Sequence, residues 1–172
     1  MHMTRSSARM FAAAFTALAI FAAGALFAGA QSANRALKAG EKIHLNPAGM
    51  FKPSTYTHVI SAQPGRVIFI SGQVAFNEKG ELVGKGDLRA QTVQVLENLS
   101  TALKASGASW SDVVKITTYV VNYSPDTLAV LREVRGKYIG TGPNPPTSTL
   151  VGIQALASPD LLIEIEAIAV IR

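Results

Sequence analysis

The sequence predicts an α+β domain in which a mixed β-sheet carries two helices on one face. Three observations support this fold class. Six stretches are rich in β-branched residues or alternate between apolar and polar residues, as strands do. Only two stretches show the three- and four-residue apolar spacing of an amphipathic helix. The order β-β-β-α-β-α-β-β is typical of helices packed against one side of an antiparallel-rich sheet.

The first part of the domain is expected to contain three strands. Residues 42–45 (KIHL) predict a short strand, and the segment 46–54 contains two prolines and a glycine and predicts a loop. Residues 56–62 (YTHVISA) and 67–75 (VIFISGQVA) predict two further strands on either side of the tight turn 63–66. These two strands are expected to pair as a hairpin.

The first helix follows the glycine-containing loop 77–87. Asp87 is a suitable N-cap, because its short side chain can accept hydrogen bonds from the first turn, and Gly107 suits the C-terminal end. The apolar stripe expected to face the sheet is Val93, Leu96, Leu99 and Leu103. The polar residues expected mostly on other faces are Gln91, Gln94, Glu97 and Asn98.

The second helix is expected to begin at Pro125, with Ser124 as its cap, since proline suits the first helical position. It is expected to extend to about Ile139, where the glycine- and proline-rich loop 140–146 begins. The remaining strands are expected over 112–121, 147–156 and 161–171.

The last strand is apolar on both faces, although one face carries two carboxylates. Alternation places Ile163, Ile165, Ala167 and Ala169 on one face and Leu162, Glu164, Glu166, Ile168 and Val170 on the other. The strand before the second helix is similar, with Val113, Thr117, Tyr119 and Val121 opposite Val114, Ile116 and Val120. Such strands need cover on both sides, and two helices cover one face only. We therefore expect the second face to contact another subunit.

Residues 1–30 have the pattern of a secretory signal peptide. A basic start is followed by an uncharged apolar run and by Ala28-Gly29-Ala30, whose small residues suit cleavage before Gln31. We expect export to the periplasm or the medium, with no stable membrane insertion after cleavage. The alternative is an uncleaved anchor, because an apolar run of about 18 residues is borderline for spanning a bilayer. Residues 31–41 are expected to be a flexible lead-in to one domain, 42–172.

The composition argues against several classes of function. The chain has 16 basic and 11 acidic residues, a net charge of +5, and loss of Arg5 and Arg9 with the signal peptide leaves 14 basic residues, or +3. This small, dispersed excess gives little reason to expect a nucleic-acid partner. The absence of cysteine excludes disulfides, thiolate catalysis and cysteine-ligated metals. No other residues compose a metal site, and no cofactor is expected.

Five segments carry a resemblance to a known family: YTHVI, ISGQVAFNEKGELVG, AQTVQVLENLSTALKASGAS, DVVKITTYVV and PPTSTLVGIQALASPDLLIEIEAIAV. In this order they resemble the blocks of the Rid (reactive intermediate deaminase) or YjgF family, over about residues 43–171. The resemblance implies a chorismate-mutase-like fold and a homotrimer. In that trimer three sheets form a central barrel with helices outside, and clefts for small-molecule ligands lie between subunits.

The resemblance also implies an activity. Well-known members hydrolyse enamines and imines to a keto acid and ammonia. In them an arginine shortly after a proline binds the substrate carboxylate, and a glutamate in the last strand positions or activates the attacking water. Here the proline matches Pro146 and the glutamate matches Glu164. The residues expected to bind substrate are Tyr56, Ser71, Gly72, Ser148 and Thr149.

Ser148 stands at the arginine position, which argues against the family's ordinary substrate. A guanidinium binds a carboxylate through two charge-assisted hydrogen bonds, whereas a serine hydroxyl offers one neutral hydrogen bond. The loss is about 2–3 kcal/mol, or roughly 30- to 150-fold in affinity. Either Arg132 or Arg135 in the second helix replaces the missing cation, or the substrate is not a standard 2-imino acid. Leu150 and Leu131 stand at the family's cysteine and asparagine positions.

Glu164 is the expected catalytic residue, because a carboxylate at a subunit interface can act as a general base towards water. The alternative is a structural glutamate paired with backbone amides or a lysine. Glu166 is expected to form a structural ion pair with Lys115, and His58 is expected to be a structural histidine.

Two functions remain open at this point. One is a trimeric hydrolase that deaminates reactive imine or enamine compounds at clefts between subunits. The other is a non-catalytic trimeric module that binds small molecules or acts as a protective, chaperone-like protein. Glu164 and the Ser71-Gly72-Gln73 segment favour the enzyme, whereas Ser148 and the predicted export favour the alternative.

Overall fold

The computed structural model describes residues 36–139 and 143–172. The chain divides into two units between Ala36 and Leu37, and the fold described below is that of Leu37–Arg172. The predicted signal peptide, 1–30, and the first residues of the predicted lead-in, 31–35, lie outside the described residues. No helix in the described part of the chain is long and apolar enough to cross a membrane.

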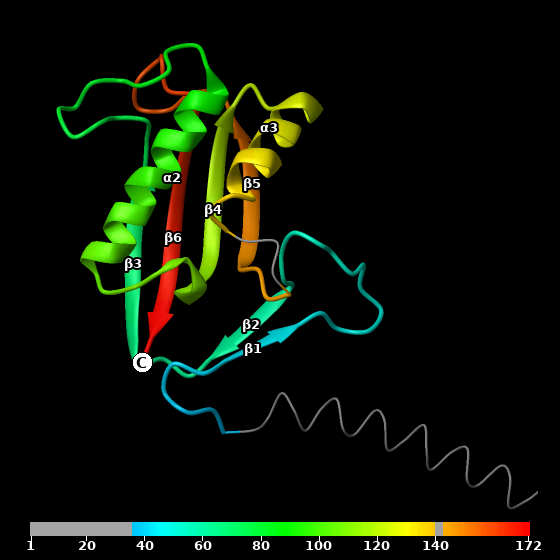
Figure 1. Cartoon of the computed structure of the whole chain (residues 1–172). Helices are drawn as coiled ribbons and strands as arrows, with labels where there is room; N and C mark the ends of the chain where they lie inside the picture. The colour runs from blue at the N-terminus through cyan, green and yellow to red at the C-terminus, as the bar shows by residue number, and fades with distance from the viewer. Residues whose placement is uncertain (1–35, 140–142) are drawn as a thin grey trace, which may run out of the picture. The chain divides into compact units, whose positions relative to one another are not determined.

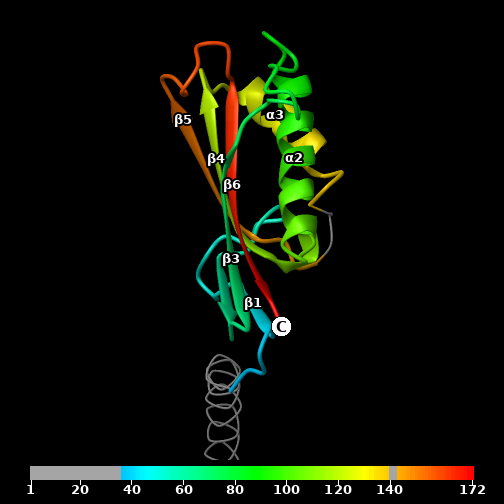
Figure 2. The ribbon, with the colours of Figure 1, turned by 90° about the vertical axis from the view of Figure 1, so that its left-hand side faces the viewer.

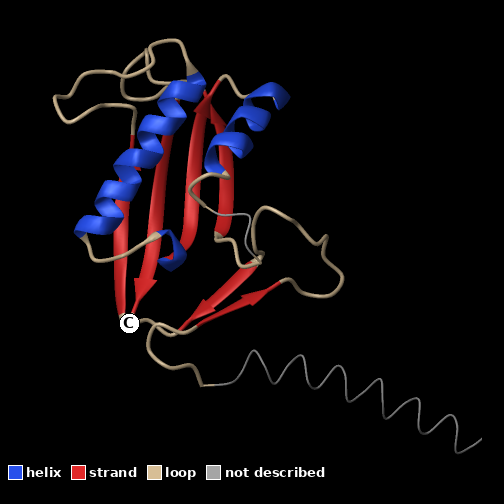
Figure 3. Ribbon diagram, in the orientation of Figure 1, coloured by secondary structure: helices blue, strands red, loops and turns tan. Residues whose placement is uncertain are grey.

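The order of helices and strands agrees with the prediction (Figures 1 and 3). The elements are β1 (Lys42–Leu45), β2 (Val59–Ala62), β3 (Arg66–Gln73), α2 (Leu88–Ala105), a 3₁₀ turn (Trp110–Asp112), β4 (Val113–Val121), α3 (Pro125–Arg135), β5 (Thr147–Ile153) and β6 (Ile163–Ile171).

Four strands form the main sheet in the order β3-β6-β4-β5, and β1 and β2 form a separate two-stranded sheet. β6 is antiparallel to both of its neighbours, whereas β4 and β5 are parallel, so the main sheet is mixed as predicted. The predicted hairpin between 56–62 and 67–75 is wrong, because β2 pairs with β1 and β3 pairs with β6.

The pairing of β2 continues beyond its last residue towards the N-terminus of the domain. The N–H of Gly40 donates to the carbonyl of Gln63 at 2.7 Å, and the N–H of Gln63 donates to the carbonyl of Glu41 at 3.1 Å. The eight residues of β3 pair instead with the nine residues of β6, which offers a longer ladder than the four-residue β2. The turn predicted at 63–66 could not show whether β3 pairs with β2 or with β6.

Both helices lie on one face of the main sheet (Figure 2). The core between the two layers includes Leu96, Leu99, Leu103, Ile116, Val120, Leu131, Ile163 and Ile165. No helix of the described residues covers the other face, which we call the outer face. Val67, Phe69 and Val151 are exposed on it, and Phe69 is 78% exposed.

The predicted caps of both helices are confirmed. Asp87 Oδ1 accepts from the N–H of Ala90 at 3.1 Å, and Ser124 Oγ accepts from the N–H of Thr127 at 3.3 Å. Gly107 adopts the left-handed conformation after α2, with φ 75°.

The second helix ends earlier than predicted, at Arg135 and not near Ile139. The N–H groups of Tyr138 and Ile139 both donate to the carbonyl of Arg135, at 3.0 and 2.9 Å, so the chain leaves the helix in a tight turn.

Gln91 and Val93 differ from the prediction for α2. Val93 is 38% exposed, whereas Gln91 is fully buried. The amide nitrogen of Gln91 donates to the carbonyls of Gly84 (3.2 Å) and Asp160 (2.8 Å), and its oxygen accepts from the N–H of Leu162 (2.8 Å). One side chain therefore satisfies three backbone groups of two loops, which a pattern of hydrophobic residues does not detect.

The two faces of β6 follow the predicted alternation. Ile163, Ile165, Ala167 and Ala169 are buried on the helix side. In β4 the predicted face of Val113 is wrong, since Val113 belongs to the helix-side core. The register between β4 and β6 shifts between Val113 and Lys115, and such a bulge reverses the face of the residue before it.

We predict that Gln91→Ala destabilises the domain by about 3 kcal/mol or more, because three buried backbone groups lose their partner at about 1–3 kcal/mol each. Chemical denaturation with urea measures this loss. Gln94→Ala is the matched control, since Gln94 lies in the same helix and donates only to Asn98. If the two substitutions lower the free energy of unfolding equally, the three hydrogen bonds of Gln91 do not stabilise the domain as proposed.

Candidate functional site

Glu164 and Gly72 meet on the outer face of the sheet. The register between β3 and β6 is irregular from Ile70 to Gln73, so Gly72 lies in a break of the ladder. A Cβ atom added to Gly72 would lie 1.7 Å from Glu164 Oε1 and 2.8 Å from its Cγ. The Glu164 side chain therefore lies against the backbone of β3, and only a glycine leaves room for it.

The carboxylate of Glu164 has no hydrogen bond or ion pair with any side chain of 36–139 or 143–172. In the ladder it is opposite Tyr119 of β4, and Glu166 is opposite Thr117. The predicted ion pair of Glu166 with Lys115 is wrong, because Lys115 Nζ donates to Thr149 Oγ1 at 2.7 Å. Glu164 is partly buried and available to a ligand.

Ser71 and Gln73 flank Gly72 and contact each other. The amide nitrogen of Gln73 donates to the Ser71 carbonyl at 3.1 Å and to its hydroxyl at 3.4 Å. The structure thus brings together three of the predicted residues, Glu164, Ser71 and Gly72, at one end of β3.

A second group forms around Ser148, at the β5 edge of the sheet. Ser148 is in register with the core residue Ile116 and so faces the helices. Arg135 Nη1 donates to Ser148 Oγ at 3.1 Å, and its Nη2 donates to the carbonyl of Thr55 at 3.4 Å. A guanidinium from α3 therefore lies beside the position at which the family resemblance predicts an arginine.

The environment of Arg135 is unusual for an arginine. Burial lowers its pKa, and the nearby charge of Arg132 lowers it further. Among the described residues no carboxylate pairs with Arg135; its acceptors are a hydroxyl and a carbonyl. A partly buried cation without an anion is a suitable place for an anionic ligand group.

Tyr56 lies in a segment that is attached to the start of β5 through its neighbour Thr57. The N–H of Thr57 donates to the carbonyl of Pro146 at 3.2 Å, and its hydroxyl donates to the carbonyl of Pro145 at 2.7 Å. These bonds fix the segment of Tyr56 beside the start of β5. The ring of Tyr56 contacts that of His58 edge-on, with centroids 5.4 Å apart.

Thr149 and His58 have other surroundings. Thr149 faces the outer side, away from Ser148, and accepts from Lys115. His58 Nε2 hydrogen-bonds the carbonyl of Phe51 at 2.6 Å, which supports its expected structural role. Within the described residues no group of His, Asp and Glu side chains is placed to hold a metal ion.

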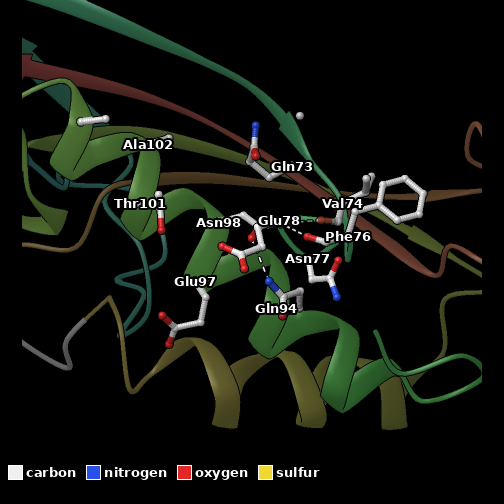
Figure 4. A pocket seen from close by; sticks show the side chains of 12 residues that line it. Gln73, Val74, Phe76, Asn77, Glu78, Gln94, Glu97, Asn98, Thr101 and Ala102 are labelled. Atoms are coloured by element: carbon white, nitrogen blue, oxygen red, sulfur yellow. Dashed lines mark hydrogen bonds between the residues drawn. The ribbon is translucent and has the colours of Figure 1, made fainter. Parts of the chain in front are cut away.

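A groove that the sequence analysis missed runs beside the end of β3 (Figure 4). It has a volume of about 700 Å³ and extends from Gly72 and Gln73 to the polar residues Gln94, Glu97, Asn98 and Thr101 of α2. The amide nitrogen of Asn98 donates to the carbonyls of Val74 (2.9 Å) and Phe76 (2.8 Å) and ties α2 to this segment. The polar face of α2 was the signal in the sequence, but nothing there showed which strand it borders.

Glu97 in this groove accepts a hydrogen bond from the hydroxyl of Tyr138 at 2.6 Å. Burial, together with this bond to Glu97, raises the pKa of Tyr138 to about 12. The Glu97 carboxylate therefore has a hydrogen-bond partner, whereas the Glu164 carboxylate has none among the described residues.

The two groups of site residues are separated within one chain. Glu164 is on β6 and points to the outer face, whereas Ser148 is on β5 and faces the helices. Two strand spacings, about 10 Å, lie between β6 and β5. One ligand of ordinary size cannot touch both groups through the sheet, so a single chain does not bring all the predicted residues into one site.

Comparisons with known proteins agree with this fold. Residues 51–171 match the protein family described as Endoribonuclease L-PSP. A solved structure from Yersinia pestis, described as a protein of unknown function of the conserved Rid protein family, is 45% identical with a TM-score of 0.70; the match covers 76% of this chain and 98% of that one.

Curated relatives give the same assignment. A RutC family protein of Pyrococcus horikoshii is 42% identical over 115 residues, which are 66% of this chain and 85% of the relative. A 2-iminobutanoate/2-iminopropanoate deaminase of Dermatophagoides farinae is 31% identical over 112 residues, covering 65% and 84%. The chain therefore belongs to the Endoribonuclease L-PSP family, which is the Rid/YjgF family that its sequence resembles.

Proposed function

We propose that this protein is a hydrolase that deaminates imine or enamine compounds to a carbonyl product and ammonia, at clefts between copies of the chain. The observation that carries the proposal is the contact of Arg135 with Ser148, which supplies a guanidinium where the sequence alone shows none. The similarity to a named 2-iminobutanoate/2-iminopropanoate deaminase supports the reaction class.

The contact of Arg135 with Ser148 makes a carboxylate-bearing imine a suitable substrate again. The serine at position 148 argued against a carboxylate-bearing imine, since a hydroxyl binds an anion weakly. Arg135 can supply the charge-assisted contact that Ser148 cannot, because its guanidinium is close to Ser148 and has no carboxylate partner among the described residues. A carboxylate-bearing imine is therefore a suitable substrate in this proposal. A substrate carboxylate would bind Arg135 and accept a further hydrogen bond from the Ser148 hydroxyl.

Glu164 acts as the general base in this proposal. It accepts a proton from a water as the water oxygen bonds to the imine carbon, and the imine nitrogen takes a proton from solvent, which leaves an amine and a hydroxyl on the same carbon. Glu164 then passes its proton to the amine nitrogen, the C–N bond breaks to release ammonia, and the hydroxyl returns its proton to solvent to give the carbonyl product. Gly72 keeps Glu164 close to the β3 backbone, which holds the carboxylate in one place.

The two groups of residues meet when the β3 edge of one copy lies beside the β5 edge of another. Both β3 and β5 are edge strands of the main sheet. Val67, Phe69 and Val151 are exposed on the outer face of the two edge strands, and contact between copies would remove these apolar side chains from water, which supports such an assembly. We propose the trimer that the family resemblance implies.

We predict that Glu164→Gln lowers the catalysed rate by about 10²- to 10⁴-fold, the usual contribution of a general base. The assay uses the full chain and the imine of alanine, produced in place by an amino-acid oxidase, and follows ammonia and keto acid above spontaneous hydrolysis. Glu166→Gln is the matched control on the same face of β6 and retains the wild-type rate. A wild-type protein without activity would favour the non-catalytic binding module.

We predict that Arg135→Gln raises the KM for the same imine by about 30-fold or more, because a charge-assisted contact is lost. The double variant Ser148→Arg with Arg135→Gln recovers most of this loss, since it returns the guanidinium to β5. Thermal unfolding of each variant reports whether the fold is intact. If Arg135→Gln leaves the KM unchanged in a folded protein, Arg135 does not bind the substrate.

A further inference from the structure

Arg132 is a second cation near Arg135 that the proposed reaction does not use. It lies one turn earlier in α3 and is exposed, and its guanidinium has no hydrogen bond or ion pair within the described residues. The neighbouring Glu133 is not its partner, because Glu133 pairs with Arg89 through two hydrogen bonds. Some other cations in the described part do have partners, such as Lys85 with Asp160.

Arg132 and Arg135 line the same two small cavities. One cavity, of about 80 Å³, is also lined by Ser54, Thr55, Gly136, Ile139 and Pro145. The other, of about 20 Å³, is also lined by Thr92, Thr118, Leu128, Leu131, Leu150 and Ile165. Neither cavity contains an acidic residue, so the two guanidinium groups are the only charges in their described walls.

This arrangement is electrostatically unfavourable without a ligand. Two like charges near each other repel, and the partial burial of Arg135 weakens the screening by water. A single negative charge compensates one of them, whereas two negative charges compensate both. The cavity of about 80 Å³ admits an anionic group rather than a whole ligand, whereas the cavity of about 20 Å³ has room for about one water, so the rest of the molecule would extend towards the cleft.

We propose that Arg132 and Arg135 form a binding site for a dianionic ligand, so that the preferred substrate carries a second anionic group besides its carboxylate. That the dianionic ligand is a substrate rests on the proposed function, but its binding to Arg132 and Arg135 can be tested without turnover. The second group is a carboxylate or a phosphate ester, since both accept paired hydrogen bonds from a guanidinium.

The structural alternative is that Arg132 only favours the C-terminal end of α3. Cations in the last turn of a helix interact favourably with its partial negative charge. This role predicts a change in stability when Arg132 is replaced but no change in the choice of ligand.

The first experiment measures binding to the full chain by isothermal titration calorimetry, with propionate, succinate and inorganic phosphate as probes at constant ionic strength. We expect succinate or phosphate to bind about tenfold more tightly than propionate, for one added charge-assisted contact. Arg132→Gln removes this preference and leaves the binding of propionate unchanged. Lys137→Gln is the matched control, because Lys137 is an exposed cation just after α3 that lines neither cavity.

The result for each probe identifies the source of the second charge. A preference for succinate indicates a dicarboxylate, and a preference for phosphate indicates a phosphate ester. Equal affinity for all three probes, or a preference that Arg132→Gln does not alter, overturns the inference.

A second experiment separates this inference from the proposed function. The rate constants kcat/KM are compared for imines made from alanine and from aspartate, with wild type and Arg132→Gln. We expect the variant to lose about tenfold for the aspartate-derived imine only. Turnover with an unchanged ratio overturns the dianion site and leaves the proposed function standing. Arg132-dependent binding of succinate without any turnover supports the dianion site and contradicts the proposed function.

Discussion

The structure depends on one constraint: the main sheet carries apolar side chains on both faces, and the two helices cover only one of them. The helix side forms the core with α2 and α3. The outer side keeps Phe69 and Val151 exposed, together with the carboxylates of Glu164 and Glu166. A carboxylate that serves chemistry is better placed on such a face than in the core, because it can be reached by a ligand.

The same constraint divides the site. A strand presents successive residues to opposite faces, so Ser148 on the helix side and Glu164 on the outer side cannot meet in one chain. The assembly that we propose would solve two problems together, since it would cover the apolar outer face and bring the edge strands β3 and β5 of different copies close to each other. Arg135 fits this arrangement, because a cation in α3 reaches the β5 edge without occupying a strand position.

The sequence predicted those features that depend on near neighbours. The order of elements, the caps at Asp87 and Ser124 and the alternation in β6 all follow from local patterns. The features it missed depend on distant partners. The pairing of β2 with β1, the bulge at Val113 and the buried amide of Gln91 each require knowledge of which segment lies alongside.

In the candidate site, too, the sequence indicated the residues but not the contacts between distant segments. Gly72 and Glu164 could be named from the family resemblance, but their direct contact depends on the irregular register of β3 and β6. Arg135 was one of two possible replacements for the missing arginine, and the sequence could not choose between them. Of the two, only Arg135 forms a hydrogen bond with Ser148, which supports our proposal that it binds the substrate, and the cavities that Arg132 shares with it are the basis of the separate role that we propose for Arg132.

The central claim is that each site combines Arg135 of one copy with Glu164 of another. The most direct test mixes two variants, Glu164→Gln and Arg135→Gln, under conditions that allow subunits to exchange. At a substrate concentration well below the wild-type KM, where both variants are nearly inactive, the account predicts that the mixture regains about a quarter of the wild-type activity, since random assembly unites the two intact halves in one cleft of four. A mixture that stays as inactive as its components would contradict a site shared between copies.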